Sequence, residues 1–287
     1  MGINEFIEKN RRAVLMGLIG AFGSFGLWAA MNLAELNDYK SLAGLKTAEA
    51  CEEVRLPKKR AVIVCQDSVA LDDALTIRHL LVKKRYIPEC IGIGDATEQK
   101  IFSALERIAS DSVDYDKTIF YFAGHGDSYY DGILQGICVN KPSEEGEKLI
   151  RPAYLLDRLS KIKGRKAAIF NCCYSGVHVE LVRDDGKGNN ETIFPDLKNY
   201  LIIAACPSDK LMVYTPDCIP GKRVSPLTAA LFGVLKGDKQ VNLSSEPITL
   251  GTEWQRAHQQ EYAERIGVKE NKLSFEVQRV SDCDFKL

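Results

Sequence analysis

Apolar residues in this chain follow two patterns, short continuous runs and longer segments with helical spacing. Short apolar runs rich in β-branched residues are typical of strands buried on both faces. They occupy residues 61–65, 90–94, 118–123, 167–171, 200–206 and 272–277. Helical spacing occurs at residues 71–85, 96–110, 153–162, 227–237 and 253–266. The alternation predicts one α/β domain over residues 58–287, with three α/β/α layers around a mostly parallel, six-stranded sheet.

The N-terminal part has a different pattern. A basic tail, residues 1–12, precedes an uncharged apolar run at residues 13–33, and a mixed, charged linker follows at residues 34–57. Twenty-one uncharged residues, with only Ser24 and Asn32 clearly polar, are enough for a helix that crosses a bilayer. We therefore expect an N-terminal hydrophobic helix and a single-pass, membrane-associated protein.

The apolar run at residues 13–33 leaves several interpretations open. It could be a signal anchor, a cleaved signal peptide ending near Ala30 or Ala34, a helix lying in the membrane interface or packing in an oligomer, or a buried helix. Glycines recur every third residue from Gly17 to Gly26, so another helix could approach closely and the chain could self-associate.

Charge and cysteine content restrict the partners and the cellular compartment that can be expected. A net charge of −1 gives no electrostatic case for a nucleic-acid partner. Nine cysteines without regular spacing fit neither a disulfide framework nor paired zinc knuckles, so a compartment where thiols stay reduced is expected. The basic residues before the apolar run would instead hold the N-terminus in the cytoplasm and place the domain across the membrane. The orientation of the domain therefore stays open.

Candidate chemistry lies after two of the predicted strands. YFAGHGD places His125 between two glycines, and IFNCCYSG places Cys172 and Cys173 before two small residues. Since function gathers at the carboxyl ends of parallel strands, we expect these segments to meet. An imidazole can activate a thiol and protonate a leaving amine, and bare backbone amides can stabilise an oxyanion. The pattern predicts a Cys/His site with either cysteine as nucleophile, and Gly126 and that cysteine as oxyanion donors.

Together, the GHG and NCCYSG motifs resemble the caspase-like cysteine peptidases (peptidase family C14), in particular the metacaspase and prokaryotic caspase-homologue branch. LDDALTIRHLL and SPLTAALFGVL extend the resemblance over residues 58–287. It implies a caspase-like fold and a cysteine endopeptidase that acts on proteins or peptides through an acyl-enzyme. By position, His125 matches the base and Cys173 the nucleophile, whereas Cys172 falls on a variable position that points into the fold.

The same resemblance implies a P1 pocket and a mode of activation. Asp73 and Asn171 match the residues that hold a basic P1 side chain, but Asn171 replaces an aspartate, so the expected preference for basic P1 is weakened. The family also implies a large segment, here residues 58–182, and a small one, residues 199–287. The loop between them, residues 183–198, would be cleaved within residues 183–196 on activation.

Some metacaspases require calcium, and Asp157 and Glu180 lie roughly where such ligands would be sought. Two carboxylates do not make a calcium site, which usually needs six or more oxygens, so no metal or other cofactor is predicted. Two other functions stay open. One is a transpeptidase or asparaginyl-type peptidase on the same fold, and the other is a catalytically silent scaffold.

Overall fold

The central sheet has six strands in the order β13-β8-β7-β3-β1-β2. Neighbouring strands are parallel except for β13, which runs antiparallel to β8 at one edge. The strands are β1 (Lys59–Cys65), β2 (Ile87–Ile91), β3 (Lys117–Ala123), β7 (Arg165–Asn171), β8 (Tyr200–Ala204) and β13 (Gln278–Ser281). This computed structural model describes residues 57–114, 116–129, 134–140, 147–182, 197–212, 215–219, 222–236, 241–244, 264, 269, 273–274 and 277–287. A mostly parallel six-stranded sheet is therefore confirmed.

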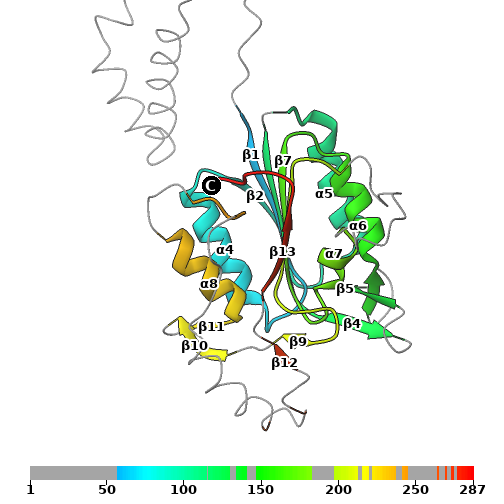
Figure 1. Ribbon diagram of the computed structural model, residues 1–287, viewed down its shortest axis with the longest axis vertical. Helices are drawn as coiled ribbons and strands as arrows, with labels where there is room; N and C mark the ends of the chain where they lie inside the picture. The colour runs from blue at the N-terminus through cyan, green and yellow to red at the C-terminus, as the bar shows by residue number, and fades with distance from the viewer. Residues whose placement is uncertain are drawn as a thin grey trace, which may run out of the picture. The chain divides into compact units, whose positions relative to one another are not determined.

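Helices cover both faces of the sheet, as Figure 1 shows. Helices α4 (Leu71–Lys83) and α8 (Pro226–Leu235) lie on one side, and α5 (Glu98–Asp111) and α6 (Pro152–Ser160) on the other. Alternate residues of β3 enter different cores, since Tyr121 packs with the α4 side while Phe120 and Phe122 pack with the α5 side. This alternation follows from the two-residue side-chain period of a strand.

Local sequence explains where two of these helices begin. The Thr97 side chain accepts a hydrogen bond from the Lys100 amide, 3.3 Å away, and so caps α5. Ser225 caps α8 in the same way, accepting from the Thr228 amide at 3.1 Å, and Pro226 follows at the first helical position. The Ser225 cap matters again below because its hydroxyl also contacts the candidate site.

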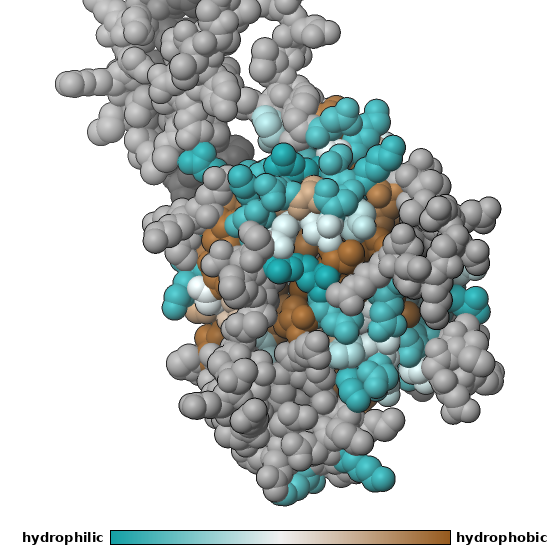
Figure 2. Space-filling view, viewed as in Figure 1, coloured by the Kyte–Doolittle hydropathy of each residue, from teal (hydrophilic) through white to brown (hydrophobic). Residues whose placement is uncertain are grey.

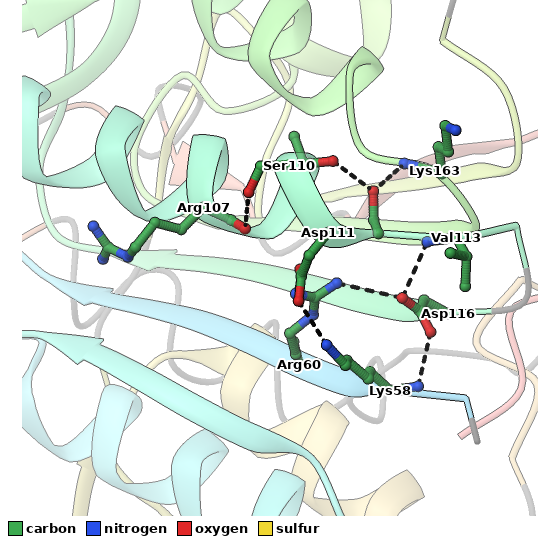
Figure 3. A network of polar contacts seen from close by, with 10 residues as sticks. Lys58, Arg60, Arg107, Ser110, Asp111, Val113, Asp116 and Lys163 are labelled. Carbon is green, nitrogen blue, oxygen red and sulfur yellow. Dashed lines mark hydrogen bonds and ion pairs between the residues drawn. The ribbon is translucent and has the colours of Figure 1, made fainter. Parts of the chain in front are cut away.

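A polar network fastens the amino-terminal ends of β1 and β3 to the end of α5 (Figure 3). The buried carboxylate of Asp116 accepts hydrogen bonds from the Lys58 amide at 2.8 Å and the Val113 amide at 3.1 Å. Arg60 contacts Asp116 at 3.4 Å and also bonds Asp111, which accepts from Lys58 Nζ at 2.6 Å. The network lies at the end of the strands opposite to His125 and Cys173, so its role is structural.

Two predicted strands are displaced in the structure. The sixth strand of the sheet is Gln278–Ser281, whereas the predicted strand at residues 272–277 contains only β12 (Leu273–Ser274), which pairs with β9 (Leu211–Met212) in a separate sheet. Strand β2 covers Ile87–Ile91 instead of residues 90–94. It lies at an edge of the sheet and is only partly buried, so it lacks the continuous apolar run used to find the central strands.

Small elements that the pattern did not predict lie near the carboxyl edge. Strands β4 (Gly126–Tyr129), β5 (Leu134–Asn140) and β6 (Glu147–Ile150) form an antiparallel sheet that begins directly after His125. Strands β10 (Thr215–Ile219) and β11 (Lys222–Val224) form a two-stranded sheet, and α7 (Val177–Glu180) is a single helical turn. Short polar strands of this kind have too few apolar positions for periodicity to identify them.

Several expectations fall on residues outside those that the structure describes. They concern the hydrophobic helix at residues 13–33, the loop at residues 183–196 and nearly all of the predicted helix at residues 253–266. Within the described ranges, every helix is too short or too polar to cross a bilayer. Figure 2 shows hydrophilic residues over much of the described surface, with hydrophobic ones between them.

Candidate active site

The segments that carry His125 and Cys173 follow neighbouring strands in matched register. Strands β3 and β7 pair from Lys117 opposite Arg165 to Ala123 opposite Asn171. His125 and Cys173 each come two residues after the last pair, and the Gly124 amide donates to the Asn171 carbonyl at 3.3 Å. The sheet therefore brings the two motifs to the same edge, as expected.

Gly126 is the point where the two segments touch. A Cβ atom built on Gly126 would lie 2.0 Å from the Cys173 carbonyl oxygen and 3.1 Å from Cys172 Sγ. No side chain fits at the first distance, so the glycine is required by internal packing. The sequence suggested an oxyanion-donor role for the bare amide of this glycine, and the structure adds that the chain's own cysteine loop packs against it.

His125 is held by residues that follow β1. Its amide donates to Gln66 Oε1 at 3.2 Å, and its imidazole Nε2 lies 2.8 Å from Asp67 Oδ2. Gly124 permits this arrangement because a Cβ there would lie 2.6 Å from Gln66 Cβ. Although partial burial opposes the shift, the hydrogen bond from His125 and the Ala70 amide lower the pKa of Asp67. Asp67 is therefore a carboxylate at neutral pH, next to the candidate base.

Cys173 is half-buried, and its sulfur accepts a hydrogen bond from the Met212 amide at 3.3 Å. Burial and the nearby Cys206 thiol raise the pKa of Cys173 to about 12. The thiol is therefore protonated at neutral pH in this structure and needs a base in order to react. Cys172 is fully buried, and burial raises the pKa of its thiol as well, which agrees with the expectation that it points into the fold.

The chain turns sharply after Cys173. Tyr174 has a φ of 56°, in the left-handed region, and its amide donates to the Lys210 carbonyl at 2.9 Å. The small residues that follow pack internally. A Cβ on Gly176 would lie 2.5 Å from the Ser208 amide nitrogen, and the buried Ser175 hydroxyl accepts from the Ala205 amide at 3.0 Å. Their small size is required by the packing of this turn.

Asp73 and Asn171, the expected P1-pocket residues, lie together in a buried polar cluster with Ser225. Asp73 Oδ1 accepts from the Ser225 amide at 2.9 Å and lies 3.1 Å from its hydroxyl, while Asn171 Oδ1 lies 2.6 Å from that hydroxyl. One hydroxyl proton can serve only one of these acceptors at a time. Both side chains are completely buried, so the two residues meet as predicted but do not face solvent.

The cluster holds an incompletely satisfied negative charge. Among the described residues, Asp73 Oδ2 and Asn171 Nδ2 have no hydrogen-bond partner. Burial raises the pKa of Asp73 to about 6, although Thr228, Ser225 and Asn171 nearby partly offset the effect. Within the described part of the chain, only Ser225 meets ordinary hydrogen-bond geometry with the carboxylate. Asp73 is thus largely ionised at neutral pH but poorly solvated, which favours a cationic partner.

The calcium candidates are engaged elsewhere. Asp157 is exposed and pairs with Lys161 of its own helix at 2.9 Å, and Glu180 accepts a hydrogen bond from Ser208 at 2.5 Å. In the part of the chain that the structure describes, no three His, Cys, Asp or Glu side chains are grouped so that they could hold a metal ion.

Sequence reasoning missed four contributors to the site. Gln66 and Asp67 follow β1 and were visible as polar residues at the end of an apolar strand, one strand away from His125. Ser225 and Thr228 come from the start of α8, more than 150 residues after Asp73, and no local pattern connects them. His178 lies close to Cys173 in the sequence but is buried and stacks on Phe170, with ring centroids 3.7 Å apart.

Comparison with known protein families identifies the domain. A family model described as the caspase domain matches residues 58–260, and a search of curated proteins found no significant match. Among solved structures, a crystallised protein from Geobacter sulfurreducens has a TM-score of 0.48 and 16% sequence identity, covering 79% of this chain and 95% of its own. Since the family model spans most of this 287-residue chain, the protein belongs to the caspase domain family of peptidase family C14.

Proposed function

We propose that this protein is a cysteine endopeptidase in which Cys173 is the nucleophile and His125 is first the base and then the acid. The observation that carries the proposal is the contact of the two motifs, because the backbone at Gly126 rests directly on the Cys173 carbonyl. Matched register of β3 and β7 supports the same pairing. Membership of the caspase domain family agrees with peptide-bond hydrolysis.

In the proposed reaction, His125 takes the proton of the Cys173 thiol while the sulfur attacks the carbonyl carbon of the scissile bond. The oxyanion accepts hydrogen bonds from the Gly126 and Cys173 amides. The imidazolium then protonates the leaving amine, and water attacks the resulting acyl-enzyme with His125 again as the base. Because the pKa of the thiol is raised to about 12, proton transfer to His125 must accompany the attack.

The proposed substrates are proteins or peptides with a basic P1 residue. A lysine or arginine side chain would supply the donor that Asp73 Oδ2 lacks and neutralise its buried charge. An acidic P1 residue would place a second negative charge beside Asp73, which is unfavourable. Asp73 and Asn171 are both inaccessible to solvent, so substrate binding must be accompanied by rearrangement of the groups around them.

The peptidase is tested with the full chain, a library of fluorogenic peptides and a thiol-directed probe. Cys173→Ala should abolish both cleavage and labelling, whereas Cys172→Ala, the matched control, should retain both because its thiol is buried beside the site. Cleavage after lysine or arginine would support the role of Asp73. Failure to cleave any peptide, with no preferential labelling of Cys173, would refute the proposal.

Activation and location are proposed from the sequence alone. Cleavage within residues 183–196 would separate the large and small segments, and residues 13–33 would attach the chain to a membrane. Substitution of the basic residues in this loop would test the proposed activation, because it should block self-cleavage of the chain. Removal of residues 1–56 would test the proposed membrane attachment, since the shortened protein should move from the carbonate-washed membrane fraction to the supernatant.

A further inference from the structure

We propose that Asp67 is a positioning residue that sets which nitrogen of His125 carries a proton and stabilises the imidazolium formed during catalysis. The proposal rests on the function proposed above, in which His125 is the base. It adds a carboxylate from the end of β1 to the cysteine and histidine supplied by β7 and β3.

The contact itself is short and partly sheltered. His125 Nε2 lies 2.8 Å from Asp67 Oδ2, and the side chains are 60% and 21% exposed respectively. Because most of the His125 side chain is exposed, its contact with Asp67 is a main restraint on the orientation of the ring. A carboxylate accepts hydrogen bonds only, so His125 presents an N–H from Nε2 to it.

Asp67 is itself fixed in place. Its other oxygen, Oδ1, accepts from the Ala70 amide at 2.9 Å, and its carbonyl accepts from the Cys65 thiol at 3.2 Å. The preceding residue, Gln66, donates its amide to the Ala123 carbonyl at 3.0 Å and accepts the His125 amide through its side chain. The segment after β1 therefore holds both the backbone and the ring of His125, which is what a positioning role requires.

This arrangement decides how protons move. With the Nε2 proton directed to Asp67, the thiol proton of Cys173 must pass to Nδ1. As the sulfur loses this proton and attacks the substrate carbonyl, the ring becomes an imidazolium with protons on both nitrogens, next to the Asp67 carboxylate. The Nδ1 proton then passes to the leaving amine, so the imidazole becomes neutral again with its Nε2 proton unchanged. No other reactant is needed.

Asp67→Asn provides a sharp test because the Ala70 amide keeps its acceptor. If Oδ1 stays bonded to that amide, the new amide nitrogen replaces Oδ2 and presents donors to His125. Nε2 must then accept and the proton moves to Nδ1, so the ring cannot take the thiol proton. We expect Asp67→Asn to be at least as impaired as Asp67→Ala, in which His125 can still adopt the productive tautomer part of the time.

Kinetics on the full chain give the first measurement. With a peptide that the wild type cleaves, kcat should fall about 100- to 1,000-fold in both variants, as expected for impaired acid–base catalysis. KM should change less than threefold because the role proposed for Asp67 is in proton transfer and not in substrate binding. The control Asp95→Asn removes an exposed carboxylate that contacts Lys100 and should leave kcat unchanged. Thermal melting verifies that each variant is folded.

Nitrogen NMR of the His125 ring gives the second measurement, and it does not depend on peptidase activity. In the full chain with Cys173→Ala, the ring should carry its proton on Nε2, and addition of Asp67→Asn should move it to Nδ1. An unchanged tautomer, or folded Asp67 variants with kcat within threefold of the wild type, would overturn the proposal. If the wild type cleaves no peptide, the proposed peptidase fails while the tautomer still decides the role of Asp67.

Discussion

Asp73→Asn should make the domain more stable than the wild type at neutral pH, because it removes a negative charge that the fold buries. Asp73 is fully buried in the first turn of α4, and only one of its oxygens is hydrogen-bonded among the described residues. Asparagine has nearly the same shape and can still accept from the Ser225 amide, but it carries no charge. Such a residue, unfavourable for stability but retained by the chain, is the kind expected at a functional site.

The magnitude follows from the ionisation of Asp73. Its pKa rises from 3.8 to about 6 on folding, a difference of about two units, which corresponds to about 3 kcal/mol at 1.36 kcal/mol per unit. Because the folded pKa is raised, the folded state binds more protons than the unfolded state in this window. Wild-type stability therefore contains a component that is present below pH 3.8 and is lost as the pH rises to about 6. The asparagine variant has no such component.

Urea denaturation of both proteins from pH 4 to pH 8 measures this difference. The stability of Asp73→Asn relative to wild type should increase by about 2 to 3 kcal/mol between pH 4 and pH 7 and then stay constant. His178, whose pKa burial lowers to about 4, acts in the opposite direction over this range, but it is present in both proteins and cancels. Asp72→Asn, in the same turn and partly exposed, is the matched control.

Two results would refute the reasoning about Asp73. A difference in the free energy of unfolding that does not vary with pH would mean that burial does not raise the pKa of Asp73. An Asp73→Asn variant that cleaves after lysine and arginine as efficiently as the wild type would remove Asp73 from the P1 pocket, even if the stability measurement agrees.

Three further predictions concern the site and its support. Gly126→Ala should destabilise the domain by about 1 to 3 kcal/mol and abolish cleavage, because the new Cβ would lie 2.0 Å from the Cys173 carbonyl oxygen. A variant with wild-type thermal melting and wild-type activity would contradict this packing. Asp116→Ala should lower stability by about 3 to 5 kcal/mol, because it leaves two partly buried amides without their acceptor and removes one of the two carboxylates that pair with Arg60. Activity per folded molecule should be retained, and urea denaturation together with a peptidase assay would measure both. Alkylation of Cys173 by iodoacetamide should accelerate up to pH 10 because its pKa is raised to about 12, and a plateau near pH 7 would instead indicate a preformed thiolate.

Much of the sheet could be predicted because its central strands are buried on both faces. The runs at residues 118–123 and 167–171 correspond closely to β3 and β7, and their apolar character follows from the helices that cover them. The edge strands were harder to place. β2 is half-exposed, and β13 has no fully buried residue, so neither has the continuous apolar run that marks the centre.

The sequence by itself determined the α/β class and the two strand ends that carry His125 and Cys173. These features depend on the period of a strand and on residues close together in the chain. Only the tertiary structure decided that Asp67 bonds His125, 58 residues later, and that Asp73 is buried under Ser225, 152 residues later. Such contacts arise because the sheet order places β1 beside β3 and α8 beside α4, and no local pattern encodes that order.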